Sequence, residues 1–234
     1  MINTVLAFIT SVVVSYLIGS IPSAYLVGRA FKGVDIRQVG SHNMGAMNTF
    51  YAIGFWPGMI VLVSDVCKGI VSLLFAYLIA TYLFVVAGNM VVPVEMAAGI
   101  AVIAGHNFPV FLKFKGGKGG ATAIGVLAFL LAWINWVDIG SLKLPLPLGD
   151  LIFLGSFLIL TLITRWPTAA YAISFIVFWL IAWFVYKDTG LFIYAIFVTA
   201  VPVLMYIPRL KEIWAKSGHN FVRGIFRRNL KDRM

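Results

Sequence analysis

Apolar stretches long enough to cross a lipid bilayer alternate with short polar segments from the start of the chain to beyond residue 200. Of the 234 residues, 62% are hydrophobic and only 11% are charged. A soluble domain has roughly 45–50% apolar and about 25% charged residues. Because a membrane helix needs about 20 mostly apolar residues, the pattern predicts an all-α integral membrane protein and excludes a water-soluble globular domain.

Hydropathy predicts a bundle of seven transmembrane helices. They lie near residues 5–27, 56–86, 94–111, 121–137, 151–164, 169–186 and 191–207. The third and fifth stretches are short, so each needs burial by neighbours or help from flanking residues. Residues 1–208 then form one membrane domain, and residues 209–234 form a basic C-terminal tail, predicted to lie as an amphipathic segment on the anionic inner leaflet.

Basic residues are unevenly distributed between the predicted loops. With the N-terminus outside, the outer loops hold only Lys143 and Lys187, and nearly all other Lys and Arg residues fall on inner segments. Cytoplasmic loops are enriched in Lys and Arg. The charge pattern therefore predicts an outside N-terminus, a cytoplasmic C-terminus and a bacterial inner-membrane location, with no removed signal peptide. The polar, glycine-rich segments are also inner, so the functional site is expected to face the cytoplasm.

The first of these segments is residues 35–48, with the sequence DIRQVGSHNMGAMN. Its glycines allow turns that expose backbone N–H groups, and its Ser and Asn side chains are neutral donors for oxyanions. The same composition is common in loops that only connect helices, so that alternative stays open. The candidate site residues are Arg37, Gly40, Ser41, Asn43, Gly45 and Asn48.

The second segment is residues 113–122, with the sequence KFKGGKGGAT, and it leads directly into an apolar stretch. Glycines around a lysine predict a backbone nest, and the N-terminus of the following helix adds N–H groups and a positive dipole end. The expected ligand is a phosphate, although a flexible basic loop is the alternative. Gly119 stands where a Walker A loop has Ser or Thr, so nucleotide hydrolysis is not supported. The candidates are Gly116, Gly117, Lys118, Gly119 and Thr122.

Several polar residues stand alone in apolar surroundings. Asp65 and Lys68 are three residues apart and can neutralise each other on one helical face, or Lys68 can bind a ligand directly. His106 fits an interfacial histidine as well as a base, and Glu95 is expected to be solvated at the outer interface. The remaining candidates are Ser23 near the end of the first span and His219, Asn220 and Arg223 in the tail, where they could close over a phosphate.

These segments together resemble the bacterial integral-membrane acyl-phosphate:glycerol-3-phosphate acyltransferases. The resemblance rests on GSIPSAY at 19–25 with the 35–48 segment, DVCKG at 65–69, and GHNFPVFLKFKGGKGGAT at 105–122. It implies transfer of a fatty acyl group from acyl phosphate to the 1-hydroxyl of glycerol 3-phosphate, which gives lysophosphatidic acid and phosphate, the first step of phospholipid biosynthesis. No metal or other cofactor is implied.

The resemblance also implies roles and partners. Ser41, Lys118 and His106 are the expected catalytic residues, and the other candidates named above bind the substrates. Whether Ser41, His106 or a substrate phosphate oxygen takes the hydroxyl proton stays open. The partners are acyl phosphate, glycerol 3-phosphate and membrane lipid, with no nucleic acid, and the reaction invites coupling to an acyl-phosphate-producing enzyme.

Two positions depart from the family pattern. Tyr51 stands where the family has Arg, and Ser217 stands where it has His, with His219 displaced by two residues. A relative that binds anionic lipid or uses another acceptor is therefore an alternative, as is a small transporter of a phosphorylated solute. No histidine is followed by Asp five residues later, which excludes the acyltransferase class that relies on that pattern.

Overall fold

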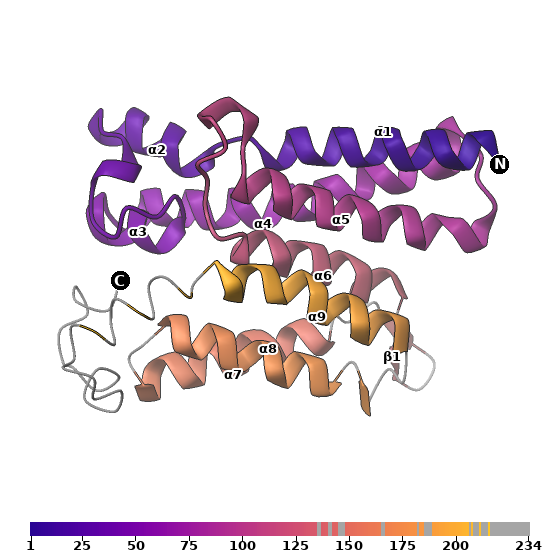
Figure 1. Ribbon diagram of the computed structural model, residues 1–234. Helices are drawn as coiled ribbons and strands as arrows, with labels where there is room; N and C mark the ends of the chain where they lie inside the picture. Colours follow the sequence, from indigo (N-terminus) through magenta and orange to yellow (C-terminus); the bar gives the residue numbers. More distant parts are fainter. Residues whose placement is uncertain are drawn as a thin grey trace. The chain divides into compact units, whose positions relative to one another are not determined.

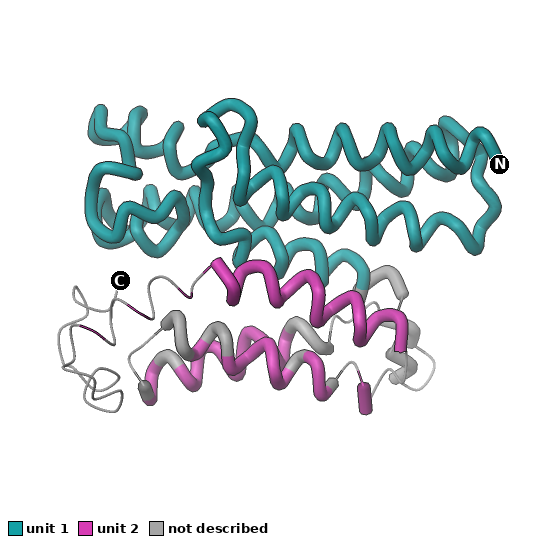
Figure 2. The backbone as a smooth tube through the Cα atoms, viewed as in Figure 1, with its two compact units in different colours: residues 1–130 teal, residues 131–234 magenta. Residues whose placement is uncertain are grey.

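The computed structural model describes residues 1–134, 137–139, 142–144, 148–164, 167–181, 183–184 and 189–205, and the single positions 207, 211 and 215. The chain divides into two compact units, residues 1–130 and residues 131–234 (Figure 2). Helices dominate both units (Figure 1).

The first unit contains the helices that carry the three motifs. Its elements are α1 (Ile2–Gly19), α2 (Ser23–Lys32), the 3-10 turn η1 (Ile36–Gln38), α3 (Ala46–Ala52), α4 (Phe55–Leu78) with a π-helical continuation η2 (Ile79–Leu83), the turn η3 (Gly88–Met90), α5 (Val91–Asn107), the turn η4 (Val110–Leu112) and most of α6 (Gly120–Ile134). Helices α1, α4 and α5 pack against one another along their lengths (Figure 1).

Glycines let these helices approach closely. A Cβ at Gly19 of α1 would overlap the Val102 carbonyl, and a Cβ at Gly105 of α5 would overlap the Tyr16 carbonyl. The same holds between α4 and α6, where a Cβ at Gly125 would overlap the Val66 carbonyl. Small residues at helix contacts are typical of membrane bundles, in which backbones pack closely without a hydrophobic driving force.

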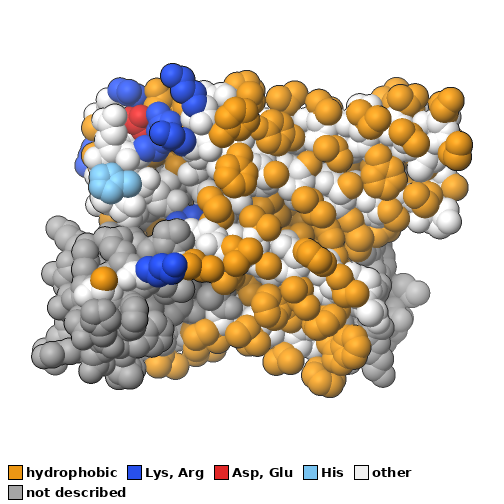
Figure 3. Space-filling view, in the orientation of Figure 1, with side chains coloured by type: hydrophobic (Ala, Val, Ile, Leu, Met, Phe, Trp, Pro, Cys, Tyr) orange, Lys and Arg blue, Asp and Glu red, His pale blue; other side chains and the backbone are white. Residues whose placement is uncertain are grey.

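Helix α1 has small residues on its buried face and large apolar residues on its exposed face. Its buried face consists of small residues spaced by four, Ala7, Ser11, Ser15 and Gly19. Its exposed face carries large apolar side chains, Leu6, Ile9, Val13 and Leu17. On the face that Figure 3 shows, hydrophobic side chains are spread along the described helices, whereas Lys and Arg of the first unit gather at the end that holds α2 and α3. A surface this apolar suits contact with lipid.

The first predicted span is wrong at its end. A single helix was expected over 5–27, but α1 ends at Gly19 and α2 starts at Ser23. Pro22 explains the break because proline has no N–H to donate and disfavours helical geometry at the residue before it. At the break the Ile21 carbonyl accepts hydrogen bonds from the Ser23 N–H at 3.0 Å and from Lys68 Nζ at 3.4 Å.

Glu95 is a second correction in this unit. The expectation of a solvated residue at the outer interface is wrong, because the Glu95 side chain is fully buried in α5. Hydropathy places a residue along a span but does not show which face of the helix packs against its neighbours. Glu95 lies on a packed face.

The second unit contains α7 (Leu148–Thr164), α8 (Pro167–Ile181) and α9 (Thr189–Leu204). Phe153 of α7 and Phe175 of α8 bring their ring centroids within 4.8 Å, and Trp179 Nε1 of α8 donates to Thr199 Oγ1 of α9 at 2.8 Å. A short antiparallel pair, β1 (Val137–Ile139) and β2 (Leu142–Leu144), departs from the all-α expectation. Both strands read apolar, polar, apolar, which is the period of a strand.

Among the described residues, three helical segments are long and apolar enough to cross a membrane: Ile2–Lys32, Phe55–Leu83 and Gly88–Leu112. Each of the other predicted spans coincides with a shorter helix, α6, α7, α8 or α9. The count of seven membrane crossings stays a prediction.

Candidate active site

Asn48 lies in the first turn of α3, and its side chain reaches back into the loop that joins η1 to α3. Its Oδ1 accepts a hydrogen bond from the Ser41 N–H at 2.9 Å, and its Nδ2 lies 3.0 Å from the carbonyl oxygens of Ile36, Val39 and Asn43. The side chain is only 1% exposed. Asn48 was expected to bind substrate, but here its amide is engaged in shaping the loop. A substrate contact would require these bonds to break, so we interpret Asn48 as a positioning residue.

The residues that Asn48 holds in place are partly accessible. Ser41, Asn43 and Gly45 are each half-buried on this loop. Gly40 turns the chain with φ of +61°, and a Cβ there would overlap Asn48 Oδ1. Glycine adopts this left-handed conformation without steric cost. Ser41 and Asn43 are therefore carried on a backbone that the Asn48 side chain holds in place.

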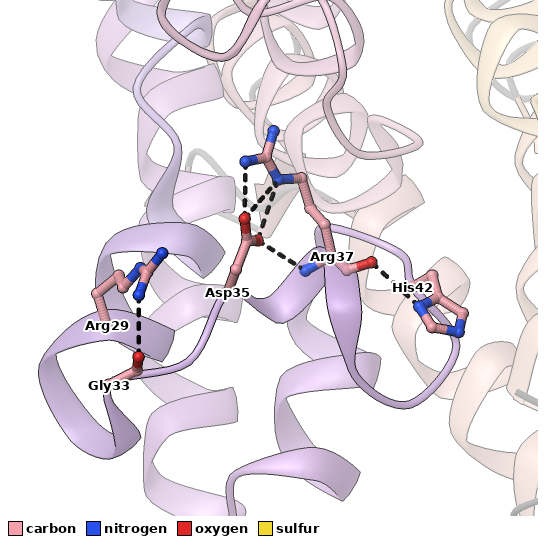
Figure 4. Close-up of polar contacts among 5 residues, drawn as sticks. All are labelled: Arg29, Gly33, Asp35, Arg37 and His42. Carbon is pink, nitrogen blue, oxygen red and sulfur yellow. Dashed lines mark hydrogen bonds and ion pairs between the residues drawn. The ribbon is translucent and has the colours of Figure 1, made fainter.

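Arg37 and Asp35 form a paired clamp at the start of the same loop (Figure 4). The Asp35 carboxylate accepts from Arg37 Nε at 3.0 Å, from Arg37 Nη2 at 2.8 Å and from the Arg37 backbone N–H at 3.0 Å. The guanidinium also lies over the Tyr25 ring, 5.4 Å from its centroid. A phosphate that reached Arg37 would have to share it with Asp35.

The clamp gives the protein an acid-sensitive contact. Hydrogen bonds from Arg37 hold the pKa of Asp35 below its ordinary value. The carboxylate therefore contributes stability at neutral pH, and the contribution is lost as the pH falls below about 4 and passes through the lowered folded-state pKa. The Asp35→Asn variant should be less stable than the wild type by about 0.5–1 kcal/mol at pH 7, since Arg37 is partly solvated.

Melting temperatures of both proteins between pH 7 and pH 3 test this prediction. The difference between them should narrow on the acid side of about pH 4. A constant difference across the range would show that the charge of Asp35 does not matter.

Asp65, Lys68, His106 and Thr122 form a buried cluster where α4, α5 and α6 meet. Lys68 Nζ lies 2.7 Å from Asp65 Oδ1, so the sequence prediction that these two residues pair is confirmed. His106 Nδ1 lies 3.7 Å from the same carboxylate oxygen and 3.3 Å from Thr122 Oγ1. His106 is 5% exposed, which places it inside the protein and not at a solvated interface.

The glycine-rich segment passes directly over this cluster. A Cβ at Gly117 would overlap His106 Nε2 and would come within 2.5 Å of the Met44 carbonyl oxygen. Gly117 is therefore the point at which the 35–48 loop, the 113–122 loop and the buried cluster touch. The three motifs, far apart in the sequence, meet in one place.

Two of the four loop glycines differ from the nest prediction. The Gly116 N–H donates to the Asn107 carbonyl and the Gly117 N–H to the His106 carbonyl, each at 3.1 Å. These N–H groups are engaged within the protein and are not directed at a ligand. The N-terminus of α6 is different, because the first N–H groups of a helix have no acceptor within the helix. The predicted phosphate nest therefore loses Gly116 and Gly117, and the prediction is left with the segment from Lys118 to Thr122.

Asn107 is a buried polar residue beside the glycine-rich loop that the sequence analysis did not name as a candidate. It is 1% exposed, neither amide atom has a hydrogen-bond partner among the described residues, and a Cβ at Gly119 would lie 2.6 Å from its Oδ1. Gly119 has φ of +78°, so it needs to be glycine on backbone grounds as well. The only signal for Asn107 in the sequence was its place beside His106 in the third motif.

The remaining candidates have no described contact with the glycine-rich loop. Ser23 is buried at the start of α2, two residues after the Ile21 carbonyl that Lys68 contacts. His219, Asn220 and Arg223 lie outside the described residues.

The tight contact at Gly117 gives a direct test of this convergence. Gly117→Ala should lower activity at least about 100-fold, because the loop must move from His106 and Met44 by more than a positioned site tolerates. Gly88→Ala is the matched control, since a Cβ at Gly88 meets nothing within 4 Å. The test compares the turnover rates of the two purified variants, and their melting temperatures show whether each variant is folded. Full activity of Gly117→Ala would contradict the observed contact.

Comparison with known proteins identifies the family of the chain. A family model described as glycerol-3-phosphate acyltransferase matches residues 9–216. A protein named glycerol-3-phosphate acyltransferase 2 from Dehalococcoides mccartyi strain CBDB1 is 47% identical over 233 residues, which cover 99% of this chain and all of the relative. The chain belongs to the glycerol-3-phosphate acyltransferase family. The resemblance noted in the sequence is confirmed.

Solved structures of glycerol-3-phosphate acyltransferases share the fold. PlsY, described as an integral membrane enzyme in its glycerol 3-phosphate form, superposes with a TM-score of 0.71 at 29% identity, covering 91% of this chain and 93% of that one. Its lysophosphatidic acid form gives a TM-score of 0.69 at 27% identity, covering 94% and 99%. The prediction of an integral membrane enzyme is confirmed, whereas the number of membrane crossings and the orientation stay predictions.

Proposed function

We propose that this protein transfers a fatty acyl group from acyl phosphate to the 1-hydroxyl of glycerol 3-phosphate, with lysophosphatidic acid and phosphate as products. The observation that carries the proposal is the meeting of the three motifs at Gly117. Two phosphate-bearing substrates need cations and neutral donors. Lys118 and the N-terminus of α6 follow Gly117 directly, and Ser41 and Asn43 belong to the loop whose Met44 carbonyl lies against Gly117. The family match over most of the chain supports the same reaction.

The reaction depends more on alignment of the two substrates than on acid or base catalysis, because acyl phosphate is already activated. The 1-hydroxyl oxygen attacks the acyl carbonyl carbon, the bond from that carbon to the phosphate oxygen breaks, and phosphate leaves as a stable anion. Cations and N–H groups fixed in advance stabilise the charge on both phosphates. Lys118 and the first turn of α6 suit the phosphate of the donor, because both present positive charge at the same loop.

His106 is proposed as a positioning residue and not as the base. Its ring lies behind Gly117, and Nδ1 is held by Thr122. His106 is 5% exposed, so its ring has little access to a substrate hydroxyl. A phosphate oxygen of the departing group is the better acceptor, since the proton ends on phosphate in the balanced reaction.

We propose an orientation with the N-terminus outside, the C-terminus in the cytoplasm, seven crossings, and the site on the cytoplasmic face of a bacterial inner membrane. Lys32 Nζ donates to the Ala52 carbonyl, which brings the basic end of α2 to α3, and the 113–118 loop reaches Met44. The basic segments of the first unit therefore gather at one end of it (Figure 3), as the positive-inside rule requires. The donor is an activated lipid, so coupling to an acyl-phosphate-producing enzyme at this face fits the same orientation.

Product analysis with matched substrates tests the proposed reaction. Purified protein in lipid nanodiscs is given palmitoyl phosphate or palmitoyl-coenzyme A, each with glycerol 3-phosphate or glycerol, and products are identified by mass spectrometry. Lysophosphatidic acid should form only from palmitoyl phosphate with glycerol 3-phosphate. Product from the thioester, or equal use of glycerol, would contradict the proposal and would favour a relative with another acceptor.

A further inference from the structure

A second set of polar groups lies inside the first unit, away from the three motifs. Glu95 of α5 is fully buried, and neither carboxyl oxygen has a hydrogen-bond partner among the described residues. It precedes His106 by eleven residues, which is three helical turns or about 16 Å along the axis. Glu95 is therefore not part of the Asp65, Lys68 and His106 cluster.

Two serine hydroxyls are also buried without a hydrogen-bond partner among the described residues. Ser11 of α1 and Ser72 of α4 are both fully buried, and neither Oγ has a hydrogen-bond partner in the part of the chain that the structure describes. The Ser15 Oγ lies 3.5 Å from the Ser72 carbonyl oxygen, which places the serines of α1 opposite those of α4. Each of the three helices thus brings an unsatisfied polar group into the interior.

The packing of the next helical turn fixes the register of these groups. Ala7, Ala76, Ala80, Val94 and Ala98 form one buried cluster from the same three helices. Ser11 follows Ala7 by one turn, Ser72 precedes Ala76 by one turn, and Glu95 is the neighbour of Val94. Ser11, Ser72 and Glu95 therefore belong to one region of the interior, next to this alanine-rich layer.

The Glu95 carboxyl group has no cationic partner among the described residues. The ion pairs among the described residues involve Asp35 and Asp65, and none includes Glu95. A carboxylate without a cation costs several kcal/mol or more in a low-dielectric interior. A neutral carboxyl group avoids that cost, and it can both donate and accept hydrogen bonds, as a serine hydroxyl can.

We propose that Ser11, Ser72 and a protonated Glu95 form a buried hydration site between α1, α4 and α5. A bound water there makes hydrogen bonds to the three side chains, as buried water does with otherwise unsatisfied polar groups. The site is separate from the phosphate chemistry. It acts as a polar contact that holds α4 against α1 and α5, on the helix that carries Asp65 and Lys68.

Isotope labelling tests the protonation state in the unaltered protein. Glu95 and Glu212 are the two glutamates in the chain, so carbon-13 labelling of glutamate side chains gives two carboxyl signals in solid-state NMR. Glu212→Gln identifies the signal of Glu95. The proposal predicts the chemical shift of a protonated carboxyl for Glu95 at neutral pH, while the Glu212 signal is that of a carboxylate. A carboxylate shift for Glu95 would overturn it.

Two further measurements separate water from a bound cation. A high-resolution structure should show a density peak within hydrogen-bonding distance of Glu95, Ser11 and Ser72, and the peak should vanish in the Ser11→Ala, Ser72→Ala double variant. The melting temperature should be the same in sodium and in N-methylglucamine buffers. Stabilisation by sodium that Glu95→Gln abolishes would overturn the hydration site in favour of a cation site.

Discussion

The Lys68→Met variant is expected to lose about 3–5 kcal/mol of stability, because it leaves the Asp65 carboxylate buried without its partner. Lys68 and Asp65 are 7% and 3% exposed, so water cannot replace the missing ammonium group. Methionine keeps the apolar stem of lysine, and the loss therefore reports on the charge and not on packing. Chemical denaturation of the purified variant in detergent measures it.

Two further variants test whether the loss of stability comes from the unpaired charge. The double variant Asp65→Asn, Lys68→Met removes both charges and should recover most of the lost stability, since neutral groups carry a smaller desolvation cost. Cys67→Ala, on an exposed neighbouring position of α4, should change stability by no more than about 0.5 kcal/mol. Equal destabilisation by the single and the double variant would show that the ion pair is not what matters.

The Lys118→Ala variant is expected to lower kcat/KM by about 100- to 1000-fold, the usual effect of removing one group that stabilises developing charge. Lys118 lies between Gly117 and Gly119, two residues before α6 begins at Gly120, and of the loop lysines it is the nearest to that helix in the sequence. The effect should appear mainly in kcat if Lys118 acts in the transition state, and in KM if it only binds the donor.

Lys115→Ala is the matched control for Lys118. Both lysines belong to the same basic segment, but Lys115 is exposed and precedes the glycines that contact His106 and Asn107. We expect its activity to stay within about threefold of the wild type, an effect of less than about 0.7 kcal/mol on the barrier. Equal losses in the two variants would point to the net charge of the loop and not to the position of Lys118.

The helical architecture could be predicted from the sequence because it depends on local properties, namely hydropathy, proline and residue spacing. Each predicted span overlaps a helix of the structure, although the first is divided between α1 and α2, and that break at Pro22 could have been predicted from the proline alone. The pairing of Asp65 with Lys68 was also predictable, since residues three apart share a helical face.

The details of the site were not readable because they depend on contacts between distant segments. Gly116 and Gly117 donate to carbonyl groups of Asn107 and His106, which the spacing of glycines does not reveal. Asn48 looks like a ligand for an oxyanion until the loop path shows that its amide is used internally. Glu95 looks interfacial until the packing of α5 shows which face is buried.

The central claim is that the three motifs form one site that joins acyl phosphate to glycerol 3-phosphate. Phosphate release by the purified, detergent-solubilised protein given palmitoyl phosphate, with and without glycerol 3-phosphate, tests it most directly. The account predicts release that requires glycerol 3-phosphate, matches lysophosphatidic acid one to one, and vanishes in Lys118→Ala. Donor binding without release, or release that ignores glycerol 3-phosphate, would contradict it.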